Sequence, residues 1–171
     1  FRVWLRTGRL NEARSGLEGR LEAEKRDPVQ TPRAHRETVL ILSLIYSFMG
    51  LGEQAYQTAC DGTRRGDDLK SPFVTAVGRM RQGHALMLLG GAENYARARE
   101  QYEKSVEISR TLAVARLRVE SGWGLCRAYG YLGDLTKAQQ HAQEAIEIAD
   151  QAGDEWIASL TRLAMGASLM L

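Results

Sequence analysis

Apolar residues follow a helical period along most of the chain, and the period is clearest between residues 122 and 149. Before Gly133, Leu125, Tyr129 and Leu132 recur at three- and four-residue spacing. After it, the same spacing continues through Leu135, Ala138, Ala142, Ala145, Ile146 and Ala149. Such spacing places the side chains on one face of a helix. Gly133 suits the left-handed residue that ends a helix, and Asp134 suits the N-cap of the next one. The stretch therefore predicts two helices folded back on each other.

This pattern repeats at a nearly constant interval. A small residue near the start of each second helix recurs as Ala13, Ala55, Ala98 and Ala138, at intervals of 42, 43 and 40 residues. The glycine that ends each first helix recurs as well, as Gly8, Gly50, Gly90 and Gly133. Several copies of one helix pair at a fixed period are typical of a solenoid, because each pair buries its apolar face against the next.

At the level of the repeat, the chain resembles the tetratricopeptide family. That repeat carries a large residue, then Leu, Tyr, Gly and two alanines, and the matching residues here are Leu125, Tyr129, Gly133, Ala138 and Ala145. The sequence departs from the family where Cys126 replaces a glycine, Gly122 replaces a Trp and Asp150 replaces a Pro. The period is also longer than the family's usual interval of about 34 residues. Long first helices of this kind look like the repeats of large bacterial regulators of the maltose-activator (LuxR-type) class and of peptide-sensing regulators.

The resemblance implies an all-α fold: a right-handed solenoid of four to five antiparallel helix pairs in one domain. The expected repeat units span 1–28, 33–68, 71–111, 113–152 and an incomplete 154–171. The expected helices are 1–7, 10–26, 33–49, 53–66, 72–89, 95–110, 113–132, 135–151 and 155–170. We expect Ser71 to cap the helix that begins at Pro72, and residues 90–94 to form a surface bulge. Since both ends look cut, we also expect a fragment of a larger polypeptide.

Composition and charge exclude several classes of protein. The chain is 44% hydrophobic and 26% charged, with a net charge of +2. No apolar run approaches the ~18 residues of a membrane helix, and no signal peptide is recognisable, so we expect a cytoplasmic location. Arg79 and Arg81 are two residues apart, as are Arg116 and Arg118, so neither pair forms one basic stripe. We therefore expect this segment to bind neither membrane nor nucleic acid.

Catalytic and metal-binding patterns are missing from the sequence. His35, His84 and His141 have no partners at metal-ligand spacing. The run from Gly50 to Ala55 matches a dinucleotide fingerprint, but it lacks the preceding strand that such a site needs. We expect no cofactor, no metal and no enzymatic activity, and we interpret Cys60 and Cys126 as reduced, buried thiols.

A ligand-binding groove is the remaining candidate site. In tetratricopeptide-like solenoids the first helix of each pair lines the concave face, so the resemblance implies ligand-facing positions on these helices. The candidate binding residues are Phe48, Met80, His84, Met87, Glu120, Trp123, Arg127 and Tyr131, and further groove positions are Glu37, Leu40, Leu44 and Val77. Phe48 and Trp123 fit ordinary core packing equally well. The lysine of the family's chaperone-tail clamp is replaced by Leu40, Met80 and Trp123, so that partner is not expected.

Two functions remain open at this point. The first is a non-catalytic module that binds a protein, a peptide or a small effector within a larger bacterial signal-transduction or transcriptional regulator. The second is a plain protein–protein interaction scaffold in a multi-domain protein with no regulatory switch. The apolar face of residues 155–171, which includes Trp156, Leu163 and Met170, also predicts a dimer formed through the C-terminal helix.

Overall fold

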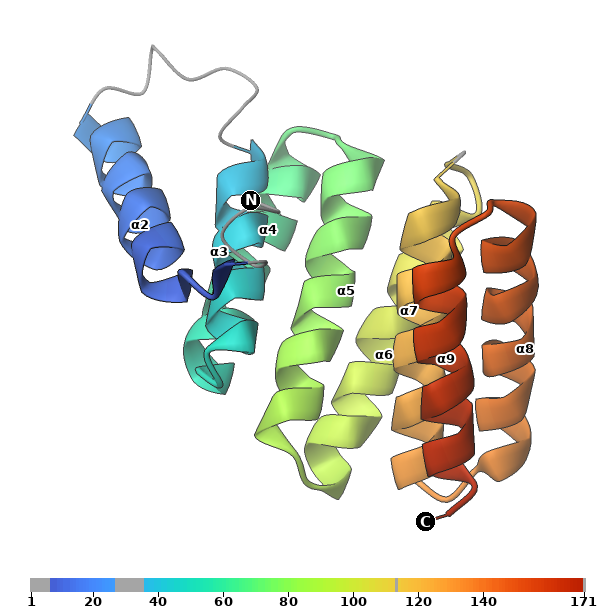
Figure 1. Ribbon diagram of the computed structural model, residues 1–171. Coiled ribbons are helices and arrows are strands. Elements are labelled where there is room, and N and C mark those ends of the chain that lie inside the picture. Colours follow the sequence, from blue (N-terminus) through green and yellow to red (C-terminus); the bar gives the residue numbers. More distant parts are fainter. Residues whose placement is uncertain (1–6, 27–35, 113, 171) are drawn as a thin grey trace.

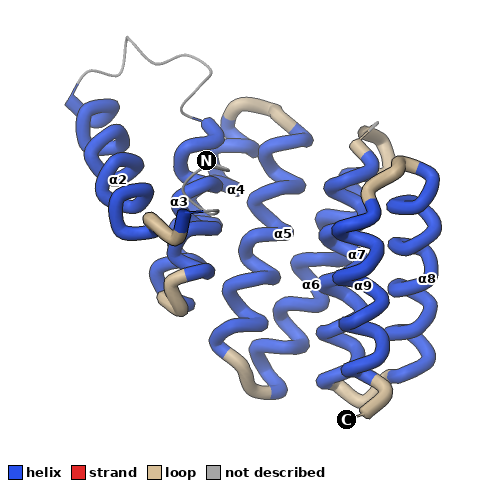
Figure 2. The backbone as a smooth tube through the Cα atoms, viewed as in Figure 1, coloured by secondary structure: helices blue, strands red, loops and turns tan. Residues whose placement is uncertain are grey.

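The chain folds into helices that stand side by side in a curved row (Figure 1). The computed structural model describes residues 7–26, 36–112 and 114–170. Within these ranges every regular element is a helix and no strand is present (Figure 2). The helices are α2 (Leu10–Arg26), α3 (Arg36–Phe48), α4 (Gly52–Asp68), α5 (Pro72–Leu89), α6 (Ala92–Ser109), α7 (Ala115–Tyr131), α8 (Leu135–Gln151) and α9 (Glu155–Ser168).

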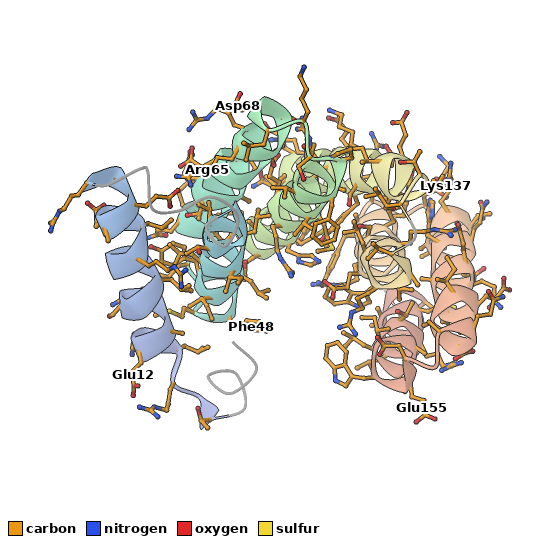
Figure 3. All side chains as sticks on the ribbon, turned by 90° about the horizontal axis from the view of Figure 1, so that it is seen from above. Glu12, Phe48, Arg65, Asp68, Lys137 and Glu155 are labelled. Carbon is orange, nitrogen blue, oxygen red and sulfur yellow. The ribbon has the colours of Figure 1, made fainter. Side chains whose placement is uncertain are left out.

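The helices form two layers. Each helix from α2 to α9 packs against the next one along the chain. The contact between α2 and α3 is the least extensive of these. In addition, α3 contacts α5, α5 contacts α7, and α7 contacts α9, so these first helices form one continuous layer. The second helices α4, α6 and α8 lie behind it. Viewed along the helices, the row bends into an arc with the first helices on its inner side (Figure 3). The predicted all-α helical repeat fold is confirmed.

Gly50, Gly90 and Gly133 follow the ends of α3, α5 and α7, as expected, with φ values of 75°, 74° and 80°. This is a region that side chains with a Cβ atom rarely adopt. Gly8 also has a positive φ of 68°, but the helix expected before it lies outside the described residues. Asp134 caps α8 by accepting a hydrogen bond of 3.1 Å from the backbone N–H of Lys137. The expected hinge between the two helices is therefore present.

Small residues allow close approach between the layers. Ala13, Ala55, Ala98 and Ala138, the repeat markers, are fully or almost fully buried. A Cβ atom on Gly78 would lie 2.9 Å from the Thr63 Cα atom, so the backbones of α4 and α5 nearly touch there. Buried hydroxyls satisfy polar groups at these contacts: the Ser105 Oγ atom of α6 lies 2.9 Å from the carbonyl oxygen of Ala76 and 2.9 Å from the Ser121 Oγ atom.

Several expected boundaries differ from the structure. Helix α6 begins at Ala92 instead of residue 95, so the connection after α5 is only Gly90 and Gly91, and the expected bulge at 90–94 is wrong. The side chain of Asn94 donates a hydrogen bond of 2.9 Å to the Gly90 carbonyl oxygen, which stabilises this early start. Ser71 occupies the N-cap position of α5 without a side-chain capping bond, while Pro72 begins the helix as expected. The expected helix at 1–7 and the start of the one at 33–49 fall largely outside the described residues.

Candidate functional site

The predicted binding residues occupy three different environments. Met80 and Met87 are only 3% and 6% exposed and belong to the apolar core, so they offer little surface to a ligand. Phe48 and Tyr131 are 56% and 47% exposed. Phe48 is the last residue of α3 and lies toward the open side of the arc (Figure 3). Tyr131 stacks on Tyr95 with ring centroids 4.6 Å apart.

The remaining predicted residues come together in one place. His84 of α5 packs edge-on against Trp123 of α7, with ring centroids 5.6 Å apart. The Arg127 guanidinium lies over the Trp123 ring, 4.8 Å from its centroid. We call these residues, together with Arg81, Tyr102 and Glu120, the inner-face cluster.

The directions of neighbouring arginines show which side of the first-helix layer the cluster occupies. Arg79 hydrogen-bonds to Gln101 of α6, and Arg118 pairs with Glu144 of α8, so both side chains reach the second-helix layer. Arg81, two residues from Arg79 on the same helix, instead approaches Glu120 of the next first helix at 3.6 Å. Residues two apart on a helix point in widely different directions. The inner-face cluster therefore lies on the side of α5 and α7 that faces away from α6 and α8.

Ion pairs continue the cluster toward the C-terminal helix. Glu120 accepts from the Arg116 Nε atom at 2.7 Å, and Arg116 also reaches Asp154 at 2.5 Å. The same guanidinium lies over the Trp156 ring of α9, 5.0 Å from its centroid. The carboxylates of Glu120 and Asp154 are thus already paired with Arg81 and Arg116.

Tyr102 enters the cluster from the opposite layer. It belongs to α6 and is 0% exposed. A Cβ atom on Gly83 would lie 2.6 Å from the Tyr102 ring, and one on Gly124 would lie 2.3 Å from it. Both distances are shorter than van der Waals contact, so only glycine at these positions leaves room for the ring. The Tyr102 ring therefore passes between α5 and α7 and packs against His84, with centroids 5.6 Å apart.

The cluster contains several buried polar atoms that have no hydrogen-bond partner among the described residues. They are the Arg81 Nε, His84 Nε2, Tyr102 Oη and Trp123 Nε1 atoms. A buried polar group without a partner costs about 1–3 kcal/mol. Such groups are rare in folded proteins, and four of them lie together in this contact network.

The chemistry of these atoms is uniform. Arg81 Nη1 lies 3.1 Å from His84 Nδ1, and a guanidinium can only donate. His84 Nδ1 is therefore the acceptor, and the proton of the neutral ring sits on Nε2. The indole N–H of Trp123 and the guanidinium Nε–H of Arg81 are also donors, and the Tyr102 hydroxyl can donate as well. The cluster offers donors and requires an acceptor.

The charges of the cluster do not cancel. Arg81 and Arg116 are paired with Glu120 and Asp154. Arg127 forms no ion pair with a carboxylate of the described residues; its guanidinium contacts the Trp123 ring instead. Three guanidinium groups and two carboxylates leave one positive charge in excess. Arg127 is the group that carries it.

Burial and the neighbouring arginines disfavour a charged His84. Burial lowers the pKa of His84 well below the ordinary value of 6.5, and the Arg81 and Arg127 charges lower it further. Burial also raises the pKa of Tyr102 above its ordinary value. Both side chains are therefore neutral near pH 7.

This arrangement predicts a pH dependence of stability. Below about pH 6.5 His84 is protonated in the unfolded chain but not in the folded protein. The unfolded state then binds more protons, so the free energy of unfolding decreases as the pH is lowered. One such group accounts for at most about 1.4 kcal/mol per pH unit. We expect His84→Gln to reduce the loss of unfolding free energy between about pH 7.5 and 5.5, as measured by urea denaturation. Burial also lowers the pKa of His141, so His141→Gln measures the separate contribution of this second histidine to the slope. An unchanged slope in His84→Gln would contradict the assignment.

Other surfaces of the described residues offer less. A shallow depression between α6, α7 and α8 is lined by Arg118 and Glu144, which pair with each other at 3.3 Å. No group of His, Cys, Asp or Glu side chains in the described ranges could hold a metal ion. Within those ranges no helix is both long and apolar enough to cross a membrane. Cys60 and Cys126 are free thiols, the first half-buried and the second buried.

The sequence pattern indicates His84, Glu120, Trp123 and Arg127 but not three other members of the arrangement. Arg81 and Arg116 were noted only as charges that do not form a stripe. Tyr102 lies on a second helix, outside the positions that the repeat assigns to the groove. The signal that could have found it is the pair of helical glycines, Gly83 and Gly124, each at a position where the two first helices need space for a large side chain.

Comparisons with known proteins support the fold. No protein-family model and no curated protein matches the chain. The crystal structure of the apo form of RapI superposes on it with a TM-score of 0.73 at 22% sequence identity. The match covers 97% of this chain and 45% of the RapI chain. The chain thus spans less than half the length of the solved structure that it resembles.

Proposed function

We propose that the chain is a non-catalytic repeat module that binds a peptide, or a segment of a protein, on the inner face of its arc. The observation that carries the proposal is the inner-face cluster: an arginine without a carboxylate partner, next to buried donors without acceptors. Aromatic and arginine side chains of this kind contribute most of the binding energy in protein interfaces.

The module belongs, in this proposal, to a larger bacterial signal-transduction or transcriptional regulator. The sequence supports it through the resemblance of its repeats to regulators of the maltose-activator and peptide-sensing types. The similarity to RapI supports it through a helical repeat fold that occupies part of a longer chain. RapI was crystallised in an apo form, which is a form without a ligand. Within such a regulator the module binds no nucleic acid itself and transmits the presence of its ligand to other domains.

Selection from a library of random hexapeptides tests this function. The wild-type module should enrich a family of related peptides, and their binding should be at least tenfold weaker to the Trp123→Ala/Arg127→Ala double variant, since two contact side chains are removed. The Arg79→Gln/Arg118→Gln variant is the matched control, because these arginines reach the second-helix layer. Circular dichroism checks that each variant keeps its helical content. Enriched peptides that bind both double variants equally would rule out the inner face.

A second candidate, an interaction scaffold that associates with itself, is favoured by a separate observation. Trp156 and Leu163 on α9, and Met170 just after its end, are all exposed, and covering each large apolar side chain is worth about 1.5–3 kcal/mol. We propose that two copies cover this face in a dimer. Sedimentation at micromolar concentration should show a dimer that Leu163→Lys abolishes, whereas Gln140→Lys, an exposed site on α8, should leave it intact. A monomeric wild-type protein would overturn the proposal.

A further inference from the structure

The inner-face cluster has the composition of a site for one particular chemical group. We infer that it binds its ligand through a single carboxylate, which Arg127 pairs with and which the buried donors of Tyr102 and Trp123 hydrogen-bond. This inference rests on the ligand-binding function proposed above and names the group that the site recognises.

The first argument is the excess of donors. The unpartnered atoms of the cluster are the His84 Nε2–H, the Trp123 Nε1–H, the Tyr102 hydroxyl and the Arg81 Nε–H. A carboxylate has two oxygens that only accept, with room for about four hydrogen bonds. An amide or a hydroxyl would bring further donors of its own. Of the common ligand groups, an anionic oxygen acceptor fits this set.

The second argument is the size of the charge. Glu120 neutralises one guanidinium and Asp154 a second, so Arg127 alone remains. A carboxylate carries one negative charge and balances Arg127. A phosphate group carries closer to two near pH 7 and would leave a negative charge uncompensated among buried aromatic rings, which is unfavourable.

The third argument is the fixed position of the donors. The Tyr102 ring has little room to move, because a Cβ atom on Gly83 would lie 2.6 Å from it and one on Gly124 only 2.3 Å. Arg81 holds the His84 ring through Nδ1 at 3.1 Å and thereby sets which nitrogen carries the proton. Donors that are held in place before binding lose little entropy when a ligand arrives.

The route into the site follows from the exposure of its parts. Tyr102 is completely buried, while Trp123 and Arg127 keep part of their surface exposed. The Arg127 guanidinium lies over the Trp123 ring, 4.8 Å from its centroid. Arg127 is thus the partly exposed positive charge that an acidic ligand can reach. Its long side chain can turn from the indole to the carboxylate and so open the donors beneath it.

The test follows the indole N–H signal of Trp123 in ¹⁵N-labelled protein, assigned with Trp123→Phe. Acetate is the minimal carboxylate probe, and chloride and phosphate at equal ionic strength are the comparison anions. We expect acetate to shift this signal saturably and the other two to leave it in place. Arg127→Gln should weaken acetate binding about tenfold or more, because it removes a charged partner. Tyr102→Phe should weaken it about threefold to tenfold, because it removes one hydrogen bond. Arg79→Gln should bind as the wild type does.

Two peptides identify the source of the carboxylate. N-acetylated tetra-alanine with a free C-terminus presents a terminal carboxylate, and the same peptide with a C-terminal amide and one aspartate presents a side-chain carboxylate. The fully amidated tetra-alanine, which has no carboxylate, should not shift the signal. Whichever acidic peptide binds at lower concentration identifies the preferred source.

The outcomes separate this inference from the proposed function. Library peptides that need Trp123 and Arg127 but bind equally well without any carboxylate would overturn the inference and leave the function standing. Acetate binding that needs Arg127, with no peptide enriched from the library, would leave the carboxylate site standing and overturn the function. A shift that chloride produces equally, or that Arg127→Gln retains in full, would contradict the carboxylate site.

Discussion

Tyr102→Ala is expected to lower the free energy of unfolding by about 3–5 kcal/mol, the usual cost of removing a large buried aromatic ring. The reason is its position: the ring is 0% exposed and fills the space between α5 and α7 that Gly83 and Gly124 leave open. Because glycine has no side chain, neither Gly83 nor Gly124 can fill the cavity that the lost ring would leave. Urea denaturation followed by circular dichroism measures the loss.

Tyr102→Phe is the matched control, because it keeps the ring and removes only the hydroxyl. In this structure the hydroxyl has no hydrogen-bond partner among the described residues, so its removal relieves an unsatisfied buried group. We expect the Phe variant, without ligand, to be as stable as the wild type or more so. A large loss in Tyr102→Phe would show that the hydroxyl has a structural partner and would contradict the assignment of that atom to a ligand.

Gly124→Ala is expected to be the second most damaging change, at about 1–3 kcal/mol. An added Cβ atom would lie 2.3 Å from the Tyr102 ring, and the ring cannot retreat because Gly83 contacts it as well. This cost exceeds the gain of up to ~1 kcal/mol that alanine normally brings to a helix. Thermal and urea unfolding of the single variant measure the net effect.

Two further variants show whether the contact with Tyr102 is the cause. Gly16→Ala, in α2, places its Cβ atom with nothing within 4 Å and should stabilise the protein slightly. Combining Gly124→Ala with Tyr102→Leu should cost less than the two single changes together, because the smaller side chain makes room for the methyl group. Strict additivity would contradict the packing described here.

The fold could be predicted from sequence because its determinants are local. Apolar spacing within each helix, the positive-φ glycines such as Gly133, and the cap at Asp134 act over a few residues. A repeated local pattern then indicates stacking. The start of α6 was harder to predict because two signals compete there. Two consecutive glycines suggested a longer connection, whereas the Asn94 side chain bonds to the Gly90 carbonyl oxygen and the helix begins already at Ala92.

The candidate site was only partly predictable because it depends on contacts between repeats. The family resemblance placed His84, Trp123 and Arg127 on the groove side of their helices, and the structure brings the three side chains into contact. Their role in binding stays a prediction. Met80 lies on a similar face yet is buried in the core, because the period alone does not say how closely the next helix packs. Tyr102 and Gly124 are 22 residues apart, and only the three-dimensional contact shows that one makes room for the other.

The most direct test of the account is a chemical-shift map of ¹⁵N-labelled protein on addition of the tightest-binding peptide from the hexapeptide selection. The central claim is that ligand binds on the inner face of α5 and α7. We predict that the largest changes occur at the side-chain N–H signals of Trp123 and Arg127 and at the backbone amides around His84. Residues on the opposite side, such as His141 and Glu144 of α8, should change little. Shifts confined to α8, or spread evenly over the protein with none at Trp123, would contradict the claim.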